Sequence, residues 1–485
     1  MHVLVAPGSS RLDVLRWPVI GAFLRWRHAR TAFQIVLLIA ALLVVLDGLV
    51  ASRVDPTGFA TTVVWVHYRG LLVVALLAAG NLFCSGCPFV LVRDAGRRLV
   101  PPRYTFPRWL RTKWAAIALF AAVLFCYELF DLWALPRATA WLILAYFLSA
   151  LVVDVLFKGA TFCKYLCPIG QFNFVASTCS PLELRIKDSD TCRACRTVDC
   201  IKGTRRAAAP ATVLQRGCEL RLFLPSKVGN MDCTLCLDCV HACPHDNIAL
   251  AARLPGAELA DPRRRSGIGR LAGRRDIAAL AVLFTFGSLV NAFGMIAPAR
   301  SIEAWMSQAL GVASEAPALL ALFAAAVIGA PLVLLGGGAV LARWLAGDRA
   351  RGAAQIAVNF TYALVPFGFG MWLAHYGFHL LTGALTIVPV TQRAALDLLA
   401  RPAFGQPLWT LTGLRPGLVF PIQVGFILLG AMGSLAAAYQ IAERDYPARI
   451  MAALAPWIAI VAVLTTAALW ILSQPMEMRG VAMLG

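Results

Sequence analysis

The stretch CTLCLDCVHACP, residues 233–244, spaces four cysteines as C-x2-C-x2-C-x3-C and places a proline directly after the last one. Three closely spaced thiolates on one loop can bind three irons of a [4Fe–4S] cluster, and the cysteine before the proline binds a neighbouring cluster. The stretch therefore predicts a second cysteine motif elsewhere in the chain.

A second motif lies upstream, at Cys192, Cys195 and Cys200, with Cys218 after a longer gap. The spacing of two-cluster ferredoxins predicts that each cluster takes three cysteines from one motif and one from the other. One cluster is then bound by Cys233, Cys236, Cys239 and Cys218, and the other by Cys192, Cys195, Cys200 and Cys243. The first motif is irregular, because four residues separate Cys195 from Cys200 and because Glu219, not proline, follows Cys218.

A zinc site is the alternative, because two C-x2-C pairs also build sites with four thiolate ligands. Such a site has no use for Cys239 or for the Cys243-Pro244 ending, whereas a pair of [4Fe–4S] clusters requires both. The pattern therefore favours an inserted ferredoxin-like domain with two [4Fe–4S] clusters.

The rest of the chain is strongly apolar, since 60% of its 485 residues are hydrophobic and only 14% are charged. Runs of about 20 apolar residues can cross the hydrocarbon core of a bilayer. Nine such runs occur, at residues 32–50, 61–82, 114–132, 138–157, 276–296, 315–342, 355–383, 418–440 and 450–473. None resembles a removable signal peptide. The composition predicts a polytopic α-helical membrane protein with about nine transmembrane helices.

Basic residues predict how the chain lies in the membrane. If the N-terminus is cytoplasmic, the segments on that side hold 36 of the 44 lysines and arginines, as the positive-inside rule requires. The net charge of +19 is then a topology signal, and its spread over five loops argues against nucleic acid as a partner. We expect a bacterial-type inner (cytoplasmic) membrane protein whose iron–sulfur domain faces the reducing cytoplasm, where cysteines serve as metal ligands.

These signals divide the chain into four parts. A basic cytoplasmic N-terminus precedes a four-helix membrane unit, a cysteine-rich cytoplasmic domain with a basic linker, and a five-helix membrane unit. Their predicted bounds are 1–31, 32–170, 171–275 and 276–485.

Two further cysteine pairs end the second and fourth apolar runs, Cys84 and Cys87 in CSGCP and Cys163 and Cys167 in CKYLCP. Both runs are expected to reach the cytoplasmic surface, so all four thiols should meet beneath the ferredoxin-like domain. Three interpretations stay open: a third cluster or metal site, a dithiol pair that relays electrons, and a purely structural role.

Four helices with CxxCP and CxxxCP at the cytoplasmic ends of the second and fourth, followed by a ferredoxin domain, resemble the NapH/NosR/CcoG group of membrane polyferredoxins. The resemblance covers residues 30–250. It implies electron transfer between the quinone pool or cytoplasmic donors and periplasmic or copper-related redox proteins, without naming a particular partner. The chain departs from these proteins, because it has neither the flavin domain of NosR nor the C-terminal sandwich of CcoG, and NapH has no counterpart of the five extra helices.

Three histidines are expected within the apolar runs, two of them in the second membrane unit. His375 and His379 are four residues apart and therefore share a helix face, and His67 is expected at a similar depth. Histidine within a membrane is a functional suspect, so haem, a metal, a quinol or a hydrogen-bonded core pair all remain open. We expect the second and seventh helices to pack together, with His67 facing the pair across a gap of at least ~300 Å³.

The sequence predicts a membrane-bound iron–sulfur protein that passes electrons between cytoplasmic clusters and a quinone-, haem- or metal-linked partner. The alternative is a transporter or a copper- or metal-handling accessory protein with redox-coupled clusters. Few charges occur within the five-helix unit, which favours electron transfer over transport. The sequence does not specify the donor, the acceptor or the direction of transfer.

Overall fold

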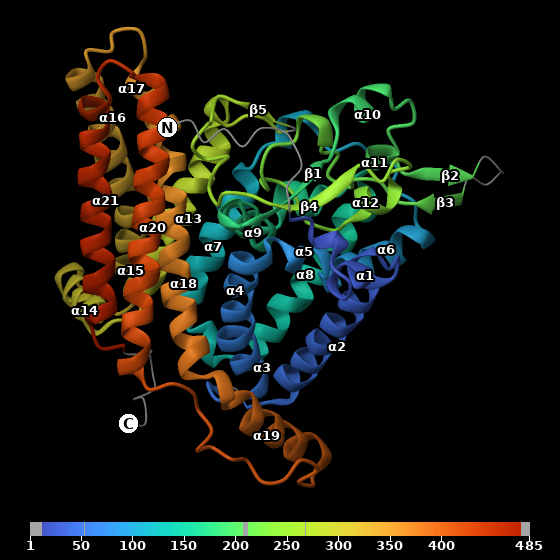
Figure 1. Cartoon of the computed structure of the whole chain (residues 1–485). Coiled ribbons are helices and arrows are strands. Elements are labelled where there is room, and N and C mark those ends of the chain that lie inside the picture. Colours follow the sequence, from blue (N-terminus) through green and yellow to red (C-terminus); the bar gives the residue numbers. More distant parts are fainter. Residues whose placement is uncertain (1–11, 53, 207–211, 267, 477–485) are drawn as a thin grey trace.

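Long helices run side by side through most of the chain, and short strands gather at one end of them (Figure 1). The computed structural model describes residues 12–52, 54–206, 212–266 and 268–476. Residues 1–11 of the predicted N-terminal part and 477–485 of the C-terminal unit lie outside the described residues. We call the end with the strands the cysteine-rich end, and the end with α19 (Ile387–Leu399) the opposite end.

The first membrane unit contains four long apolar segments. They are α2 (Ala29–Val50), the continuous α3–η2–α4 (Phe59–Thr62, Val63–Tyr68, Arg69–Ala79), α7 (Trp114–Leu129) and α8 (Pro136–Leu156). Short helices connect them or follow them: η1 (Val14–Arg16), α1 (Ile20–Arg25), α5 (Leu82–Ser85), α6 (Pro88–Leu99), η3 (Arg108–Leu110), η4 (Leu132–Ala134), η5 (Phe162–Leu166), α9 (Pro168–Ala176) and η6 (Ser177–Cys179).

The second membrane unit supplies five long segments. They are α13 (Arg275–Phe293), α15–η9–α16 (Ala316–Ala324, Ala325–Gly329, Ala330–Ala346), α17–η10–α18 (Ala353–Thr361, Tyr362–Leu364, Val365–Thr382), α20 (Pro416–Asp445) and α21 (Ile450–Ser473). At the opposite end lie α14 (Ala297–Leu310), η11 (Ala384–Thr386) and α19.

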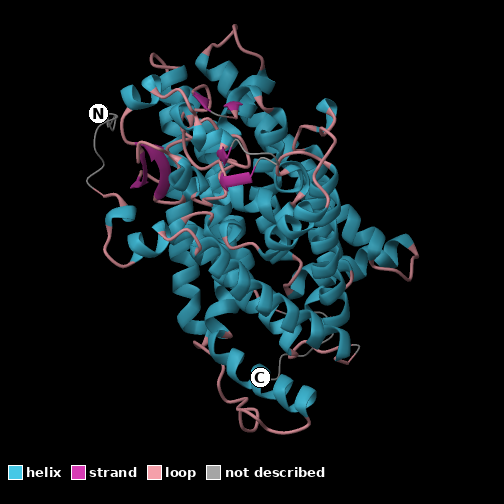
Figure 2. Cartoon of the chain, turned by 90° about the vertical axis from the view of Figure 1, so that its right-hand side faces the viewer, coloured by secondary structure: helices cyan, strands magenta, loops and turns pink. Residues whose placement is uncertain are grey.

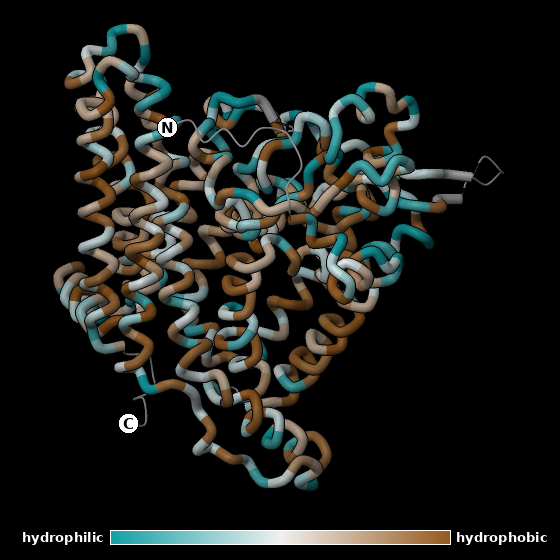
Figure 3. Tube along the Cα trace, in the orientation of Figure 1, coloured by the Kyte–Doolittle hydropathy of each residue, from teal (hydrophilic) through white to brown (hydrophobic). Residues whose placement is uncertain are grey.

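Within the described residues, eight helices are long and apolar enough to cross a membrane, which confirms a multi-pass protein. The ninth predicted run, 114–132, forms the shorter helix α7 of 16 residues, about 24 Å at 1.5 Å per residue. The helix ends early because Asp131 adopts a left-handed conformation with φ of 49°, which no α-helix continues. Figure 3 shows apolar residues along the helices and more polar residues at both ends.

Burial separates central from peripheral helices. In the apolar 18-residue window of Ala353–Thr382, 89% of the residues are buried, whereas the share is 28% in the window of Ala29–Val50, which presents exposed apolar side chains such as Val36 and Leu46. Exposed apolar surface on a long helix is what contact with lipid requires. Side chains of the central helix α18 are therefore the ones best placed to form a site in the interior of the second unit.

The cysteine-rich end contains three small antiparallel sheets (Figure 2). The pairs are β1 (Leu182–Ile186) with β4 (Ile248–Ala252), β2 (Thr204–Arg206) with β3 (Thr212–Gln215), and β5 (Arg265–Ser266) with β6 (Gly269–Arg270). Between them lie the short helices α10 (Ser189–Ala194), α11 (Asp199–Lys202), η7 (Leu224–Ser226), α12 (Asp238–Ala242) and η8 (Leu271–Gly273). Because Leu184 pairs with Leu250, β1 and β4 close a loop that contains both cysteine motifs.

A single apolar core joins this end to the membrane helices. Leu184 and Leu250 belong to the same buried cluster as Phe172 of α9 and Trp372 of α18. The Phe172 and Trp372 rings meet edge to face, with centroids 5.2 Å apart. The cysteine-rich segment is therefore packed directly onto the bundle, which positions its thiols above the membrane helices.

Candidate functional site

Cys192, Cys195, Cys200 and Cys243 lie together near the surface of the cysteine-rich end. Asn247 links two of them, because its backbone N–H donates to the Cys243 sulfur at 3.4 Å and its side-chain amide donates to the Cys192 sulfur at 3.3 Å. Burial and, to a smaller extent, the neighbouring thiols of Cys243, Cys192 and Cys195 raise the pKa of the Cys200 thiol to about 11. Cys243 therefore lies beside the cysteines of the other motif.

Cys218, Cys233, Cys236 and Cys239 form a second, more buried group. Burial raises the pKa of the Cys236 and Cys239 thiols well above the ordinary value, and the Cys218 thiol adds to the effect at both. The Cys218 sulfur also accepts a hydrogen bond from the backbone N–H of Leu222 at 3.4 Å. Each group thus combines three thiols of one motif with one of the other.

Strained backbone occurs inside both cysteine motifs. Val198, Leu235 and Leu237 have φ of 55°, 51° and 62°, a region that branched and bulky residues rarely adopt. Hydrogen bonds from the backbone N–H of Val198 and from Thr197 lower the pKa of the Cys195 thiol to about 7. At Val198 the strained backbone therefore brings an N–H group to the Cys195 sulfur, the kind of contact that tunes iron–sulfur centres.

The donor set fits iron–sulfur chemistry, because eight thiols form two groups of four and several accept N–H hydrogen bonds. No group of three or more His, Cys, Asp and Glu residues within the described part of the chain is arranged to hold a metal ion. The presence of [4Fe–4S] clusters stays a prediction.

The four membrane-surface cysteines come together at the cysteine-rich ends of their helices. Cys84, Cys87, Cys163 and Cys167 all line one cavity of about 30 Å³. Proline follows Cys87 and Cys167 at the first turns of α6 and α9, where its fixed φ favours a helix start. Asn173 donates a hydrogen bond to the Cys84 sulfur at 3.3 Å, and burial raises the pKa of that thiol to about 12.

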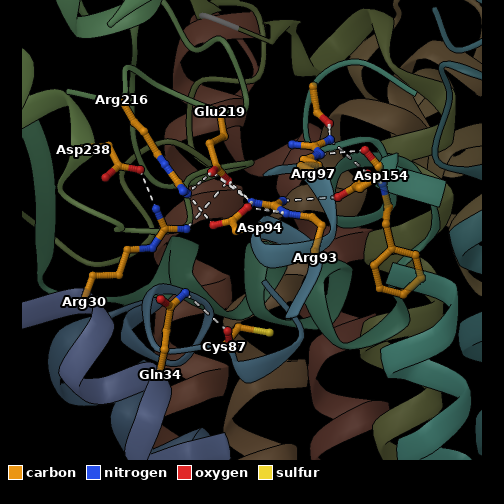
Figure 4. A network of polar contacts seen from close by, with 12 residues as sticks. Arg30, Gln34, Cys87, Arg93, Asp94, Arg97, Asp154, Arg216, Glu219 and Asp238 are labelled. Atoms are coloured by element: carbon orange, nitrogen blue, oxygen red, sulfur yellow. Dashed lines mark hydrogen bonds and ion pairs between the residues drawn. The ribbon is translucent and has the colours of Figure 1, made fainter. Parts of the chain in front are cut away.

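A network of ion pairs adjoins this cavity, which Arg30, Arg93, Asp154 and Glu219 help to line (Figure 4). Arg93 is 1% exposed and pairs with Asp154 at 3.2 Å and with Glu219 at 2.9 Å. Arg30, at the start of α2, pairs with Asp238 at 2.5 Å. Burial alone would raise the pKa of Glu219, but Arg93 and Arg30 lower it below its ordinary value.

The sequence analysis did not identify Arg30 or Arg93 as part of a site. The one signal was Glu219, which occupies the place of the expected proline after Cys218. In the structure this departure from the motif has a role, because the Glu219 carboxylate connects the cysteine motif to Arg93 of α6.

The predicted contact between the second and seventh helices is present, as α4 against α18. A Cβ on Gly70 would lie only 2.4 Å from the Leu380 Cβ, and one on Gly383 would lie 2.9 Å from a methyl group of Val66. His375 is fully buried and neither ring nitrogen has a partner among the described atoms. Its ring lies 5.1 Å from the His379 ring, centroid to centroid, nearly at a right angle.

His67, His375 and His379 line neither the thiol cavity nor the larger cavity described next, and the expected gap of ~300 Å³ between them stays a prediction. His67 instead contacts the Thr62 carbonyl oxygen, with 3.3 Å between Nδ1 and O. A cavity of about 240 Å³ lies nearby, among α2, η2, α4, α5, α6, α7, α8, α9, α13 and α18. Arg69, Tyr127, Asn291 and Tyr376 are among its polar lining residues.

Arg69 is held in an aromatic cage at the wall of this cavity. Its Nε donates to the Trp65 carbonyl oxygen at 2.7 Å, and its Nη2 donates to the Tyr127 hydroxyl at 3.0 Å. The guanidinium carbon lies 4.7–5.1 Å from the ring centroids of Trp65, Tyr127 and Tyr376. These are cation–π distances, so the cage keeps a charged group inside the bundle.

Comparison with known proteins gives distant relatives. The regulatory protein NosR of Pseudomonas aeruginosa is 26% identical over 186 residues, which are 34% of this chain and 24% of NosR. NosR of Stutzerimonas stutzeri is 24% identical over 207 residues, 38% of this chain and 25% of NosR. YccM of Escherichia coli, named for electron transport, is 25% identical over 209 residues, 36% of this chain and 53% of YccM.

No family model matches the chain, and no solved structure matches it significantly. The similarity spans about a quarter of each NosR protein and about half of YccM. Over about a third of its length, this multi-pass membrane protein is a distant homologue of NosR and YccM.

Proposed function

We propose that the chain is a membrane-bound iron–sulfur protein that transfers electrons between its cysteine-rich end and a carrier in the bilayer. The observation that supports this most is the grouping of the thiols, in which Asn247 donates hydrogen bonds to the sulfurs of Cys192 and Cys243 from different motifs. That grouping is the one that two-cluster ferredoxins use. The name of YccM, which refers to electron transport, agrees with a redox role.

The two groups of four thiols would each hold a [4Fe–4S] cluster, which supplies one-electron transfer when bound. The first group is Cys192, Cys195, Cys200 and Cys243, and the second is Cys218, Cys233, Cys236 and Cys239. The domain that carries them, 171–275, would face the cytoplasm, because that orientation places most basic residues inside. A redox partner protein would dock at this end.

The membrane-surface thiols would form a third redox centre, with Cys84, Cys87, Cys163 and Cys167 as ligands of a cluster or metal. Burial raises the pKa of these thiols, so they stay protonated at neutral pH unless a metal displaces the proton. Arg30 and Arg93 line the same cavity and would offset the negative charge of bound thiolates.

The carrier in the bilayer would be a lipid-soluble quinone. The cavity of about 240 Å³ is mostly apolar, and a cavity of ~150 Å³ already holds a benzene ring. Phe83, Phe89 and Ile169 line both this cavity and the thiol cavity, so a bound ring would lie close to the thiols. Arg69 has further N–H donors for a ring oxygen.

Spectroscopy of the purified protein tests the proposal. We expect EPR signals of two reduced [4Fe–4S] clusters and about eight irons per chain from these clusters. Cys243→Ser should remove the signal of the cluster that includes Cys192, because Cys243 supplies its fourth ligand. Cys126→Ser is the matched control, since Cys126 in α7 belongs to none of the three groups.

Two outcomes would contradict the proposal. Purified protein with bound zinc and no iron would overturn the cluster assignment. Loss of the signal from the Cys233 group, with the Cys192 group intact, would show that Cys243 binds within its own motif.

A further inference from the structure

Three buried titratable side chains at the opposite end have no part in the function proposed above. Glu128 of α7 is 5% exposed, and His375 and His379 of α18 are 0% and 7% exposed. Ionisable groups within a membrane are costly and usually serve ion or proton transfer. All three belong to elements that also line the cavity of about 240 Å³.

Glu128 lies directly behind the cavity wall. Asn291 lines the cavity, is 2% exposed, and donates from Nδ2 to the Glu128 carboxylate at 3.1 Å. The Oδ1 atom of Asn291 has no hydrogen-bond partner among the described atoms, so it is available as an acceptor for a ligand hydroxyl. Gly294 makes room for the carboxylate, because a Cβ there would lie 2.9 Å from Glu128.

The histidines extend from another part of the wall. Tyr376 lines the cavity, its ring lies 5.5 Å from the His375 ring, and His379 follows at 5.1 Å. Both His375 ring nitrogens and Nε2 of His379 lack partners among the described atoms. Because α18 runs away from the cysteine-rich end, His379 is the one closer to the opposite surface.

The titratable groups that line the cavity itself are Tyr68, Arg69, Tyr127, Tyr146 and Tyr376. Arg69 donates to the Tyr127 hydroxyl and lies over the Tyr376 ring. The Glu128 carboxylate is close enough to interact electrostatically with the hydroxyl groups of Tyr127 and Tyr376. A carboxylate, two imidazoles and two phenols therefore surround a single guanidinium next to the cavity.

We propose that Glu128 is the first acceptor for protons that leave a quinol in this cavity, and that His375 and His379 carry protons to the opposite surface. This inference rests on the quinone assigned above. Oxidation of one quinol breaks two O–H bonds and releases two protons and two electrons. The electrons go one at a time to the iron–sulfur carriers at the cysteine-rich end, while the protons go to the Glu128 carboxylate and an imidazole nitrogen.

This arrangement separates the two products of quinol oxidation. Electrons leave toward the cysteine-rich end and protons leave toward the opposite end, so each turnover would move charge across the membrane. Asn291, Tyr376 and the two histidines come from α13 and α18. The five-helix unit would thus complete the quinol site and provide its proton outlet.

The test uses the full-length protein in liposomes with decylubiquinol as the substrate and ferricyanide as a one-electron acceptor outside. Electron transfer is followed by ferricyanide absorbance, and proton release inside is followed by an enclosed pH dye. Because positioned proton acceptors accelerate reactions by roughly 10²–10⁴-fold, Glu128→Gln should lower the rate by about 10²-fold or more. Glu128→Asp should recover most of it.

A second readout does not depend on turnover. Redox-induced infrared difference spectra of the wild type should contain a carboxylic acid band that is missing in Glu128→Gln. Asp47→Asn is the matched control, because Asp47 is a buried carboxylate of the same end that accepts the Ala60 N–H at 2.8 Å and does not line the cavity. The control should keep the wild-type rate, pH profile and infrared band.

The outcomes separate the inference from the function on which it rests. Wild type that transfers no electrons from decylubiquinol overturns both. Active wild type together with a Glu128→Gln protein of unchanged rate, pH profile and infrared band overturns the inference alone. If Glu128→Gln does not fold, His375→Gln/His379→Gln takes its place, and unchanged proton release into the liposome by that variant overturns the inference.

Discussion

At the cysteine-rich end the buried Arg93 lies against the carboxylates of Asp154 and Glu219, whereas at the opposite end the buried Arg69 lies among Trp65, Tyr127 and Tyr376. Both arginines occur inside or next to apolar helices. Arg93 cross-links α6, α8 and the cysteine motif through hydrogen-bonded ion pairs. Arg69 instead faces a cavity and keeps N–H donors for a ligand.

The comparison teaches that buried charge has two uses in this chain. A fully paired charge stabilises a contact between segments, and removing one partner leaves another charge buried and unpaired. A charge held by aromatic rings and carbonyl oxygens can bind a ligand without first breaking an ion pair. Two predictions test this contrast, and a third concerns a carboxylate that is held mainly by backbone N–H groups.

The largest effect is expected for Arg93→Met, which removes the closest ion-pair partner of both Asp154 and Glu219. We expect a loss of about 3–5 kcal/mol in the free energy of unfolding, the usual cost of breaking a buried ion pair. Unfolding in mixed detergent micelles measures it. The control is Arg16→Met, because the Arg16 side chain is 74% exposed and surface pairs contribute about 0–1 kcal/mol. Equal losses for both variants would show that the buried Arg93 contributes no more to stability than the exposed Arg16.

A smaller effect is expected at the contact that supports the opposite end. Gly70→Ala would place a Cβ 2.4 Å from the Leu380 Cβ and should cost about 1–3 kcal/mol through overpacking. It should also lower the affinity for decylubiquinol, since α4 carries Arg69. Gly336→Ala, where a Cβ meets open space, is the control and should be neutral or stabilising by up to about 1 kcal/mol. A Gly70→Ala protein as stable as the control would show that α4 and α18 are not in close contact.

The smallest effect concerns a carboxylate away from the thiols, Asp348 in the loop between α16 and α17. It accepts hydrogen bonds from the backbone N–H groups of Ala350 and Arg351, both at 3.0 Å. Burial opposes ionisation, but the Arg351 N–H and further hydrogen bonds lower the pKa of Asp348 below its ordinary value. At pH 7 we expect Asp348→Ala to cost about 1 kcal/mol, as for a lost helix cap.

The pH dependence gives the sign of this effect. Because the pKa of Asp348 is lower in the folded than in the unfolded protein, its contribution is present above the unfolded value of about 3.9 and fades as the pH falls through the folded value. The melting temperatures of wild type and Asp348→Ala should therefore converge at low pH. The control is Asp397→Ala, whose side chain is 61% exposed. Curves that diverge toward low pH would reverse the assigned direction.

Local patterns of the sequence anticipated much of the fold. The nine apolar runs correspond to nine helical segments, eight of them long enough to span a membrane, because helix length and hydropathy are properties of neighbouring residues. The cysteine spacing predicted which thiols would lie together, and the four membrane-surface cysteines line one cavity. Whether metal occupies these groups stays a prediction.

The sequence was less informative about the interior polar sites. His375 and His379 were singled out by their spacing, yet the cavity next to them is lined by Arg69, Tyr127, Asn291 and Tyr376. These residues come from four separate helices, α4, α7, α13 and α18, and nothing in the spacing of any one helix shows which residues of another helix it faces.

By itself, then, the sequence determined the number of apolar helices, the clustered thiols and the expected orientation, because each depends on short stretches of chain. Only the tertiary structure decided that Glu219 replaces a motif proline to pair with Arg93, 126 residues away, and that Asn291 reaches Glu128 across 163 residues. The physical reason is that a buried polar group must find its partner wherever packing places one. In this chain those partners lie on helices far apart in the sequence.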